Sequence, residues 1–210
     1  MTAPISNVDP DDLKIPLATP GMAIGLLGGS FNPPHAGHLH VATVALARLG
    51  LDRLWMLVTP GNPLKERAGL PDLATRIEAT RALARDPRIV VTGFEATLGS
   101  AYSWVTIRHL VRTFPRVNFV WVMGADNLAG FHRWQHWRRI ATTVPLAIVD
   151  RPGSTLSAQS SPAAAALARS RLKEAAAATL IGRPAPAWVF LHARRNELSS
   201  SRLRAEGRGL

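Results

Sequence analysis

The chain has 210 residues, of which 47% are hydrophobic and 19% charged, and it contains no cysteine. This length and composition suit one folded domain with a sizeable core, and they exclude a wholly disordered chain. The lack of cysteine excludes disulfide bonds and thiol nucleophiles, and we expect a reducing, cytoplasmic location. We expect no signal peptide and no membrane-spanning segment, because no apolar stretch is long enough.

The cations outnumber the anions, with 22 arginines and 3 lysines giving a formal net charge of +11. Such an excess indicates an anionic partner, either nucleic acid or phosphorylated small molecules. Residues 151–210 hold 10 basic and 3 acidic residues, without a dense basic run interleaved with aromatic residues. We therefore expect phosphorylated small molecules as partners, with nucleic acid as the minor alternative and no membrane partner.

Apolar runs that end at glycine, proline or aspartate alternate with amphipathic segments along the chain. Residues 1–21 are expected to form a flexible leader, because prolines and aspartates interrupt every pattern there. Residues 22–210 are expected to form a single domain. Its predicted strands are 22–29, 53–60, 88–95, 118–126, 145–153 and 187–193. Its predicted helices are 38–50, 70–86, 100–114 and 136–143.

This alternation predicts an α/β fold: an open, doubly wound (Rossmann-like) parallel sheet with helices on both faces. Ligands of such sheets bind beyond the carboxyl ends of the strands. Four conspicuous stretches each follow a predicted strand, so we expect them to line one site; they are "GGSFNPPHAGH", "TPGNPLK", "MGADN" and "DRPG". The Ala/Ser-rich residues 154–178 are expected to form a surface helix behind a Ser/Pro loop.

The first of these stretches carries the strongest chemical signal. Gly28 and Gly29 remove side chains where the strand turns toward the helix, so backbone N–H groups can approach a phosphate. His35 and His38 lie three apart at the start of that helix and can donate hydrogen bonds to phosphate oxygens. The stretch is neither G-x-G-x-x-G nor G-x-x-x-x-G-K-[ST], which disfavours a dinucleotide redox cofactor and an ordinary NTPase loop. His40 is expected to be structural.

Five motifs together resemble those of the bacterial nicotinate-nucleotide adenylyltransferases, a family of the H-x-G-H nucleotidyltransferase superfamily. They occur in the family's order and are "GGSFNPPHAGH", "TPGNPLK", "MGADNL" followed by Trp134, "DRPG" and "LSSSRLR". The resemblance implies an enzyme of NAD biosynthesis. It would transfer the adenylyl group of ATP to nicotinate mononucleotide, giving deamido-NAD and pyrophosphate.

The resemblance also implies roles for individual residues. The catalytic residues would be His35 and His38, which would hold the ATP phosphates and stabilise the pentacovalent α-phosphorus. ATP would be bound by Gly28, Gly29, Ser30, Phe31, Lys65, Gly124, Asp126, Ser200, Ser201 and Arg204. Nicotinate mononucleotide would be bound by Asn32, Tyr102, Ser103, Thr106, Trp134 and Arg151. Trp134 would stack on the pyridine ring, whereas Trp55, Trp104 and Trp137 are expected in the core.

Mg²⁺ is the expected cofactor, held mainly by substrate phosphates, because no carboxylate cluster in the sequence forms a protein-built metal site. The alternatives are another H-x-G-H enzyme, such as a pantetheine-phosphate adenylyltransferase or one that prefers nicotinamide mononucleotide. A non-catalytic nucleotide- or RNA-binding protein with the same fold is a further alternative. The oligomeric state stays open, and a homodimer is one possibility.

Overall fold

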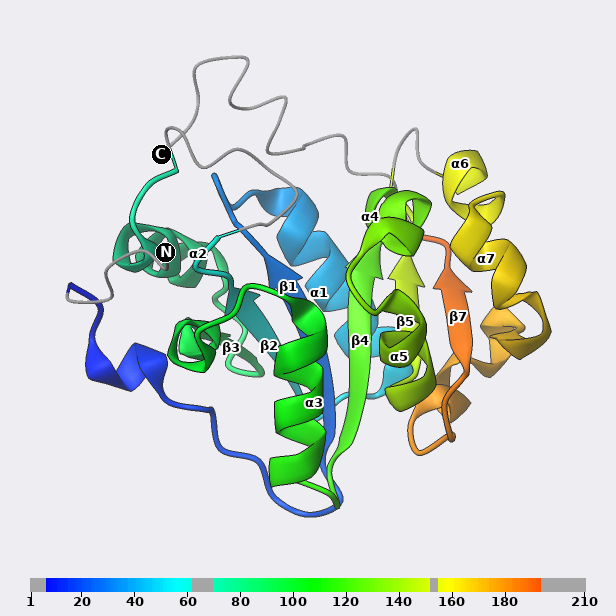
Figure 1. Ribbon diagram of the computed structural model, residues 1–210, viewed down its shortest axis with the longest axis horizontal. Helices are drawn as coiled ribbons and strands as arrows, with labels where there is room; N and C mark the ends of the chain where they lie inside the picture. Colours follow the sequence, from blue (N-terminus) through cyan, green and yellow to red (C-terminus); the bar gives the residue numbers. More distant parts are fainter. Residues whose placement is uncertain (1–6, 62–69, 152–154, 194–210) are drawn as a thin grey trace.

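A computed structural model describes residues 7–61, 70–151 and 155–193 of the chain. At its centre is a seven-stranded parallel sheet in the order β3-β2-β1-β4-β5-β7-β6 (Figure 1). The strands are β1 (Ala23–Gly29), β2 (Arg53–Val58), β3 (Ile89–Thr92), β4 (Asn118–Gly124), β5 (Leu146–Val149), β6 (Arg171–Leu172) and β7 (Trp188–Leu191). The predicted fold class and its six predicted strands are confirmed, whereas the two-residue β6 is not predicted by the sequence.

Helices cover both faces of this sheet. The helices are α1 (Ala36–Leu49), α2 (Leu73–Leu83), α3 (Ser103–Thr113), α4 (Ala125–Gly130), α5 (Trp137–Thr143), α6 (Thr155–Gln159) and α7 (Pro162–Ala166). One core cluster packs α1 and α2 against the sheet, and a second packs α3, α4 and α5 against the opposite face. In Figure 1, α3 and α5 accordingly lie in front of the sheet and α1 lies behind it. Within the described ranges, no helix has the length and apolar character needed to cross a membrane.

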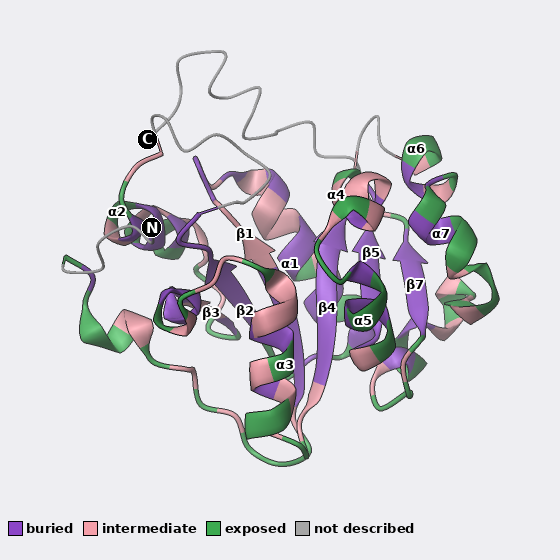
Figure 2. Cartoon of the chain, viewed as in Figure 1, coloured by how far each residue is buried: buried purple, intermediate pink, exposed green. Residues whose placement is uncertain are grey.

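The strand order reverses between β1 and β4. β1 pairs with β2 on one side, where Gly28 is opposite Leu57, and with β4 on the other, where Leu26 is opposite Trp121. The connections that leave β1 and β4 therefore diverge at the carboxyl ends of these strands, which creates the crevice where α/β sheets bind ligands. Most residues of β1 and β4 are buried (Figure 2), which explains their uninterrupted apolar sequences.

Helix α1 begins two residues earlier than the sequence predicts, because His35 takes the N-cap position. Its backbone is extended (φ −151°, ψ 167°), and its imidazole accepts a hydrogen bond from the N–H of Gly37. At the other end, Gly50 has a φ of 64° and its N–H bonds to the carbonyl oxygen of Leu46. This left-handed conformation is the one that glycine adopts without strain, so Gly50 ends the helix as its C-cap.

The described part of the N-terminal segment, residues 7–21, contacts the domain at β3. The hydroxyl of Thr92 donates to the carbonyl oxygens of Asp12 and Lys14, at 3.0 and 3.1 Å. The N–H of Gly93 also donates to Asp12, at 2.8 Å. These bonds hold the described residues against the domain edge; the flexibility of the leader and its boundary stay predictions.

The single surface helix predicted over residues 154–178 is wrong. The segment instead contains α6, α7, β6 and the 3₁₀ segment η5 (Glu174–Leu180). Ser161 and Pro162 interrupt the pattern because Ser161 caps α7, its Oγ accepting the N–H of Ala164 at 3.2 Å. Ala158 and Ala163 are fully buried in the core cluster that includes α4, so small side chains here serve close packing rather than a solvated face.

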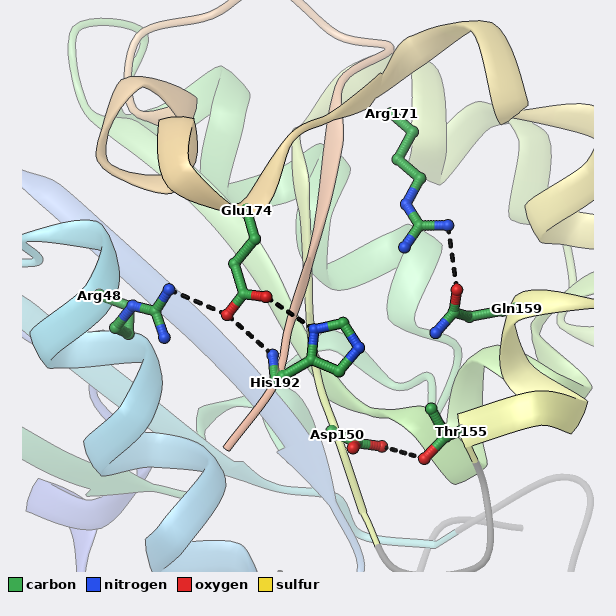
Figure 3. A network of polar contacts seen from close by, with 7 residues as sticks. All are labelled: Arg48, Asp150, Thr155, Gln159, Arg171, Glu174 and His192. Carbon is green, nitrogen blue, oxygen red and sulfur yellow. Dashed lines mark hydrogen bonds and ion pairs between the residues drawn. The ribbon is translucent and has the colours of Figure 1, made fainter. Parts of the chain in front are cut away.

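A polar network fastens this segment to the rest of the domain (Figure 3). Glu174 Oε1 accepts hydrogen bonds from Arg48 of α1 at 2.9 Å and from the backbone N–H of His192 at 3.0 Å. Glu174 Oε2 lies 2.6 Å from Nδ1 of His192, directly after β7. The hydroxyl of Thr155 donates to Asp150 at 2.6 Å, directly after β5. The segment is thus tied to α1 and to the carboxyl ends of two strands.

Candidate active site

A pocket of about 380 Å³ opens at the carboxyl ends of β1 and β4. Its wall brings together segments that follow β1, β2, β4 and β5, together with the start of α3. The predicted site residues that line it are Gly28, Gly29, Ser30, His35, His38, Tyr102, Ser103, Gly124, Asp126, Trp134 and Arg151. Their individual roles in binding and catalysis stay predictions, and the geometry below supplies the physical argument for each.

The two histidines lie side by side at the start of α1, with ring centroids 3.9 Å apart. The N–H of Gly37 donates to Nδ1 of His35 at 3.0 Å, and the N–H of His35 donates to Nδ1 of His38 at 3.2 Å. Because each Nδ1 accepts a hydrogen bond, a neutral ring must carry its proton on Nε2. The backbone therefore selects the tautomer in which both imidazoles can offer an Nε2–H donor to a phosphate oxygen.

His35 is neutral at physiological pH. Its side chain is buried, and this burial, together with the Arg151 cation and against the opposing effect of Asp126, lowers its pKa to about 4. A neutral imidazole hydrogen-bonds to a phosphate without giving up a full proton. This suits a donor that stabilises charge at a phosphoryl group rather than a general acid.

The two glycines at the end of β1 are required by aromatic packing as well as by access to the pocket. A Cβ on Gly28 would lie 2.9 Å from Cη2 of Trp121, and a Cβ on Gly29 would lie 3.2 Å from the ring of Phe31. Phe31 has a φ of 45°, and its ring contacts His38 edge-on with centroids 4.8 Å apart. The glycines thus let aromatic rings support the pocket from behind while their backbone lines it.

Across the pocket, Asp126 and Arg151 form an ion pair, with Nη1 of Arg151 3.1 Å from Oδ2 of Asp126. A Cβ on Gly124 would lie 2.5 Å from Oδ1 of Asp126 and 2.6 Å from Cδ of Arg151. Glycine at the end of β4 therefore makes room for this pair. The arginine offsets the carboxylate charge, which would otherwise repel anionic substrates.

Trp134 also lines the pocket and is half-buried. Its ring is held by two edge-on contacts, with centroids 6.3 Å from Trp121 and 5.4 Å from Phe131. The first turn of α3 lines the same pocket, and there Tyr102 is the N-cap residue and makes no side-chain cap hydrogen bond. A flat aromatic ring in one pocket with a helix N-terminus suits a planar ligand that carries a negative charge.

Three predicted site residues lie behind the pocket wall instead of lining it. Phe31 is buried beneath His38, and Asn32 follows it and is also buried. Thr106 is fully buried and donates its hydroxyl to Glu95 at 2.7 Å. Four more predicted residues lie outside the described residues, and their assignments stay predictions: Lys65, Ser200, Ser201 and Arg204.

The structure also reveals residues that the sequence analysis missed. Glu95, Arg133 and Gln135 line the pocket. Glu95 ends a predicted strand, so the strand-end signal could have found it, and the other two flank Trp134. Arg76 of α2 supports the pocket from behind, and nothing in the sequence distinguishes it from Arg81, the other arginine of that helix.

Arg76 is 1% exposed and binds backbone oxygens only, among the bonds that the described residues show for it. Its Nη1 donates to the carbonyl oxygens of Ser30 and Thr59, each at 2.8 Å, and its Nε donates to that of Pro71 at 3.0 Å. Burial lowers its pKa to about 10, so it stays charged at neutral pH. It fixes the ends of the two segments that leave β1 and β2.

Similar proteins carry names that fit this geometry. One from Methylorubrum extorquens (strain PA1), named "Probable nicotinate-nucleotide adenylyltransferase", is 58% identical over 183 residues, which is 87% of this chain and 99% of that protein. One from Rhizobium meliloti (strain 1021), with the same name, is 56% identical over 188 residues, which is 90% of this chain and 100% of that protein.

The family model described as cytidylyltransferase-like matches residues 26–206. A solved structure of Plasmodium falciparum nicotinic acid mononucleotide adenylyltransferase complexed with NaAD covers 88% of this chain and 83% of its own, with a TM-score of 0.63 at 15% identity. At that identity the likeness concerns the fold. With the close relatives, the family is established: the chain belongs to the nicotinate-nucleotide adenylyltransferases, within the cytidylyltransferase-like nucleotidyltransferases.

Proposed function

We propose that this enzyme transfers the adenylyl group of ATP to the phosphate of nicotinate mononucleotide, releasing pyrophosphate and forming deamido-NAD. The observation that carries the proposal is the pair of imidazoles at the start of α1, each with its Nδ1 accepting a backbone hydrogen bond, in one pocket with the Trp134 ring. The two imidazoles suit phosphates, and the Trp134 ring suits a pyridine ring. Because ATP is supplied in the cytoplasm, we assign the enzyme to that compartment as part of the proposal.

In this mechanism a phosphate oxygen of nicotinate mononucleotide attacks the α-phosphorus of ATP. The new O–P bond forms as the bond from the α-phosphorus to the bridging oxygen breaks, and pyrophosphate leaves with that electron pair. No covalent enzyme intermediate is needed, because nucleophile and leaving group are both phosphates. The residues contribute by orientation and charge stabilisation, chiefly through the Nε2–H donors of His35 and His38.

Mg²⁺ fits this site as an ion carried by the substrate. Among the residues that the structure describes, no three His, Cys, Asp or Glu side chains come together to hold a metal. The Asp126 carboxylate is engaged by Arg151. The ATP phosphates and water would therefore supply most of the ligands, as is usual for Mg²⁺. When bound, the ion would neutralise phosphate charge during transfer.

The substrate side of the proposal rests on Trp134 and the first turn of α3. The pyridine ring would stack on Trp134, and its carboxylate would face the backbone N–H groups at Ser103. Nicotinamide mononucleotide lacks this negative charge, and a helix N-terminus favours it less. We therefore propose a preference for the nicotinate form.

The direct test is pyrophosphate release from ATP and Mg²⁺ with three acceptors measured in parallel. We expect release with nicotinate mononucleotide to exceed that with nicotinamide mononucleotide and with phosphopantetheine. A higher rate with either of the other acceptors would overturn the assignment of the substrate. ATP binding without release with any acceptor would instead support the non-catalytic alternative.

Replacing Trp134 with alanine is expected to raise the KM for nicotinate mononucleotide far more than the KM for ATP. Loss of one aromatic stacking partner costs about 1–3 kcal/mol, which corresponds to roughly a 5- to 150-fold rise in KM. Trp134→Phe keeps a flat ring and serves as the matched control, with a smaller rise. Steady-state kinetics in both substrates measures the effect, and equal rises in both KM values would contradict the stacking role.

A further inference from the structure

The indole ring of Trp121 lies between two parts of the pocket that the mechanism assigns to different substrates. Trp121 is 1% exposed and is not among the described residues that line the pocket. It belongs to β4, where it is opposite Leu26 of β1 on one side and Leu146 of β5 on the other. Strand pairing on both sides fixes its backbone, and the mechanism above gives its side chain no role.

On the phosphate side, the ring of Trp121 packs against Gly28 near the end of β1. A Cβ on Gly28 would lie 2.9 Å from Cη2 and 3.2 Å from Cζ2 of Trp121. Among the described residues, leaving aside the two chain neighbours of Gly28, no other residue comes within 4 Å of that point. Both atoms belong to the six-membered half of the indole, which reaches further from the backbone than a phenylalanine ring. This outer half of the indole therefore backs the glycine whose backbone lines the pocket.

On the pyridine side, the same ring contacts Trp134. The two ring centroids are 6.3 Å apart and the planes meet at 85°, which is an edge-on arrangement that stabilises aromatic pairs. Phe131 holds the ring of Trp134 as well, at 5.4 Å, but Phe131 does not come within 4 Å of the Cβ position of Gly28. Of the two rings that hold Trp134, only that of Trp121 thus also reaches the phosphate side.

Resting on the proposed function, we infer that Trp121 is a positioning residue: its indole sets the placement of the Trp134 ring relative to the turn at Gly28. Protein interiors are close-packed, so a smaller ring at this place lets both contacts shift. Attack on the α-phosphorus requires both substrates to be held in line, and a misplacement of about 1 Å can cost about 10²-fold in rate. Trp121 acts through Gly28 and Trp134 and not on the reacting atoms.

Trp55 of β2 provides a matched control. It is also opposite Leu26, belongs to the same core cluster and is fully buried. In Trp55 and Trp121 alike, Nε1 is buried and has no hydrogen-bond partner among the described residues. The ring of Trp55 contacts that of Phe119, with centroids 5.8 Å apart, and Phe119 does not line the pocket. Replacing either tryptophan with phenylalanine therefore removes the same atoms from the same core, yet only Trp121 packs against Gly28 and Trp134.

The decisive comparison is Trp121→Phe against Trp55→Phe, with kcat and both KM values from pyrophosphate release and Tm from thermal unfolding. We expect both variants to lower Tm to a similar extent. Trp121→Phe should also lower kcat by roughly tenfold or more, because the two substrates are no longer held in line, and raise the KM for nicotinate mononucleotide. Trp55→Phe should change neither. Unchanged kinetics in Trp121→Phe, or equal kinetic losses in the two variants, would overturn the inference.

Two double-variant cycles test each contact separately. In a Trp134→Ala background, Trp121→Phe should no longer raise the KM for nicotinate mononucleotide, because the ring that it orients is absent. Gly28→Ala alone should lower Tm, since its methyl group meets Cη2 of Trp121. Phenylalanine lacks that atom, so Gly28→Ala should lower Tm less in the Trp121→Phe background. The double variant also fills part of the space that the smaller ring leaves, which supplies a second folded protein. Additive effects in both cycles would contradict the positioning role.

Calorimetry separates this inference from the proposed function. If wild type releases no pyrophosphate with any acceptor, the proposed function fails, and the Kd for ATP then decides the role of Trp121. We expect that Kd to rise several-fold in Trp121→Phe, because the turn at Gly28 loses its backing, and to stay at the wild-type value in Trp55→Phe. In that case, an unchanged Kd in Trp121→Phe or an equal rise in both variants would overturn the positioning role.

Discussion

Replacing His38 with alanine is expected to lower kcat by about 10²- to 10³-fold, because removing one preorganised donor to a charge-developing group typically costs this much. The variant loses the Nε2–H donor of His38. In wild type the backbone N–H of His35 donates to Nδ1 of His38, which keeps the proton of a neutral His38 ring on Nε2. The variant also loses an acceptor for that N–H, which is a capping contact of α1 and costs about 1 kcal/mol of stability. The fold should therefore survive, and the loss should appear in turnover.

Pyrophosphate release measures this effect, with circular dichroism and thermal unfolding as checks of the fold. His40→Gln is the matched control: His40 lies two residues further along α1, does not line the pocket, and its Nε2 has no hydrogen-bond partner among the described residues. We expect its kcat to match that of wild type. Unchanged turnover in His38→Ala, or an equal loss in the control, would contradict the catalytic assignment.

Replacing Arg76 with methionine is expected to destabilise the protein by roughly 3–5 kcal/mol, because it leaves several buried backbone oxygens without a hydrogen-bond donor. Methionine has a similar volume, so little of this arises from a cavity. Three backbone oxygens lose their donor, those of Ser30, Thr59 and Pro71, and each buried unsatisfied group costs about 1–3 kcal/mol. The substitution also removes the desolvation cost of the buried Arg76 charge, and this offsets part of the loss of stability.

Urea unfolding monitored by tryptophan fluorescence measures the change in the free energy of unfolding. Arg81→Met is the matched control on the same helix, because Arg81 is exposed and forms a surface ion pair with Asp12. Such pairs contribute at most about 1 kcal/mol. The loss of stability in Arg76→Lys should lie between those of Arg76→Met and Arg81→Met, because an ammonium keeps the charge but cannot span all three oxygens. Similar losses in Arg76→Met and Arg81→Met would show that the buried bonds contribute little.

The residues that line the pocket show how much of the site could be predicted from the sequence. His35, Gly124 and Trp134 belong to motifs that follow strands or lie close behind one, and parallel strands bring their carboxyl ends to one edge of the sheet. The resemblance assigned Thr106 to the substrate as well, yet its hydroxyl is turned toward Glu95. A motif specifies which residues come near a site, whereas helix rotation and packing decide which side chains line it.

The sequence by itself determined six of the seven strands and four of the helices of the described structure, the fold class and the segments that meet at the pocket. These follow from local periodicity, from capping residues such as Gly50 and from motif order, all of which act over short stretches of chain. The family resemblance rests on the same local motifs.

Only the tertiary structure decided the features that depend on distant contacts. Arg76 meets Ser30, which lies 46 residues away, and Glu95 meets Thr106, 11 residues away. The alanine-rich segment is broken into short helices because Ser161 caps α7 and the alanines on either side pack into the core. Burial is the common physical reason: it removes water as a partner, so each polar group must find one that local sequence does not specify.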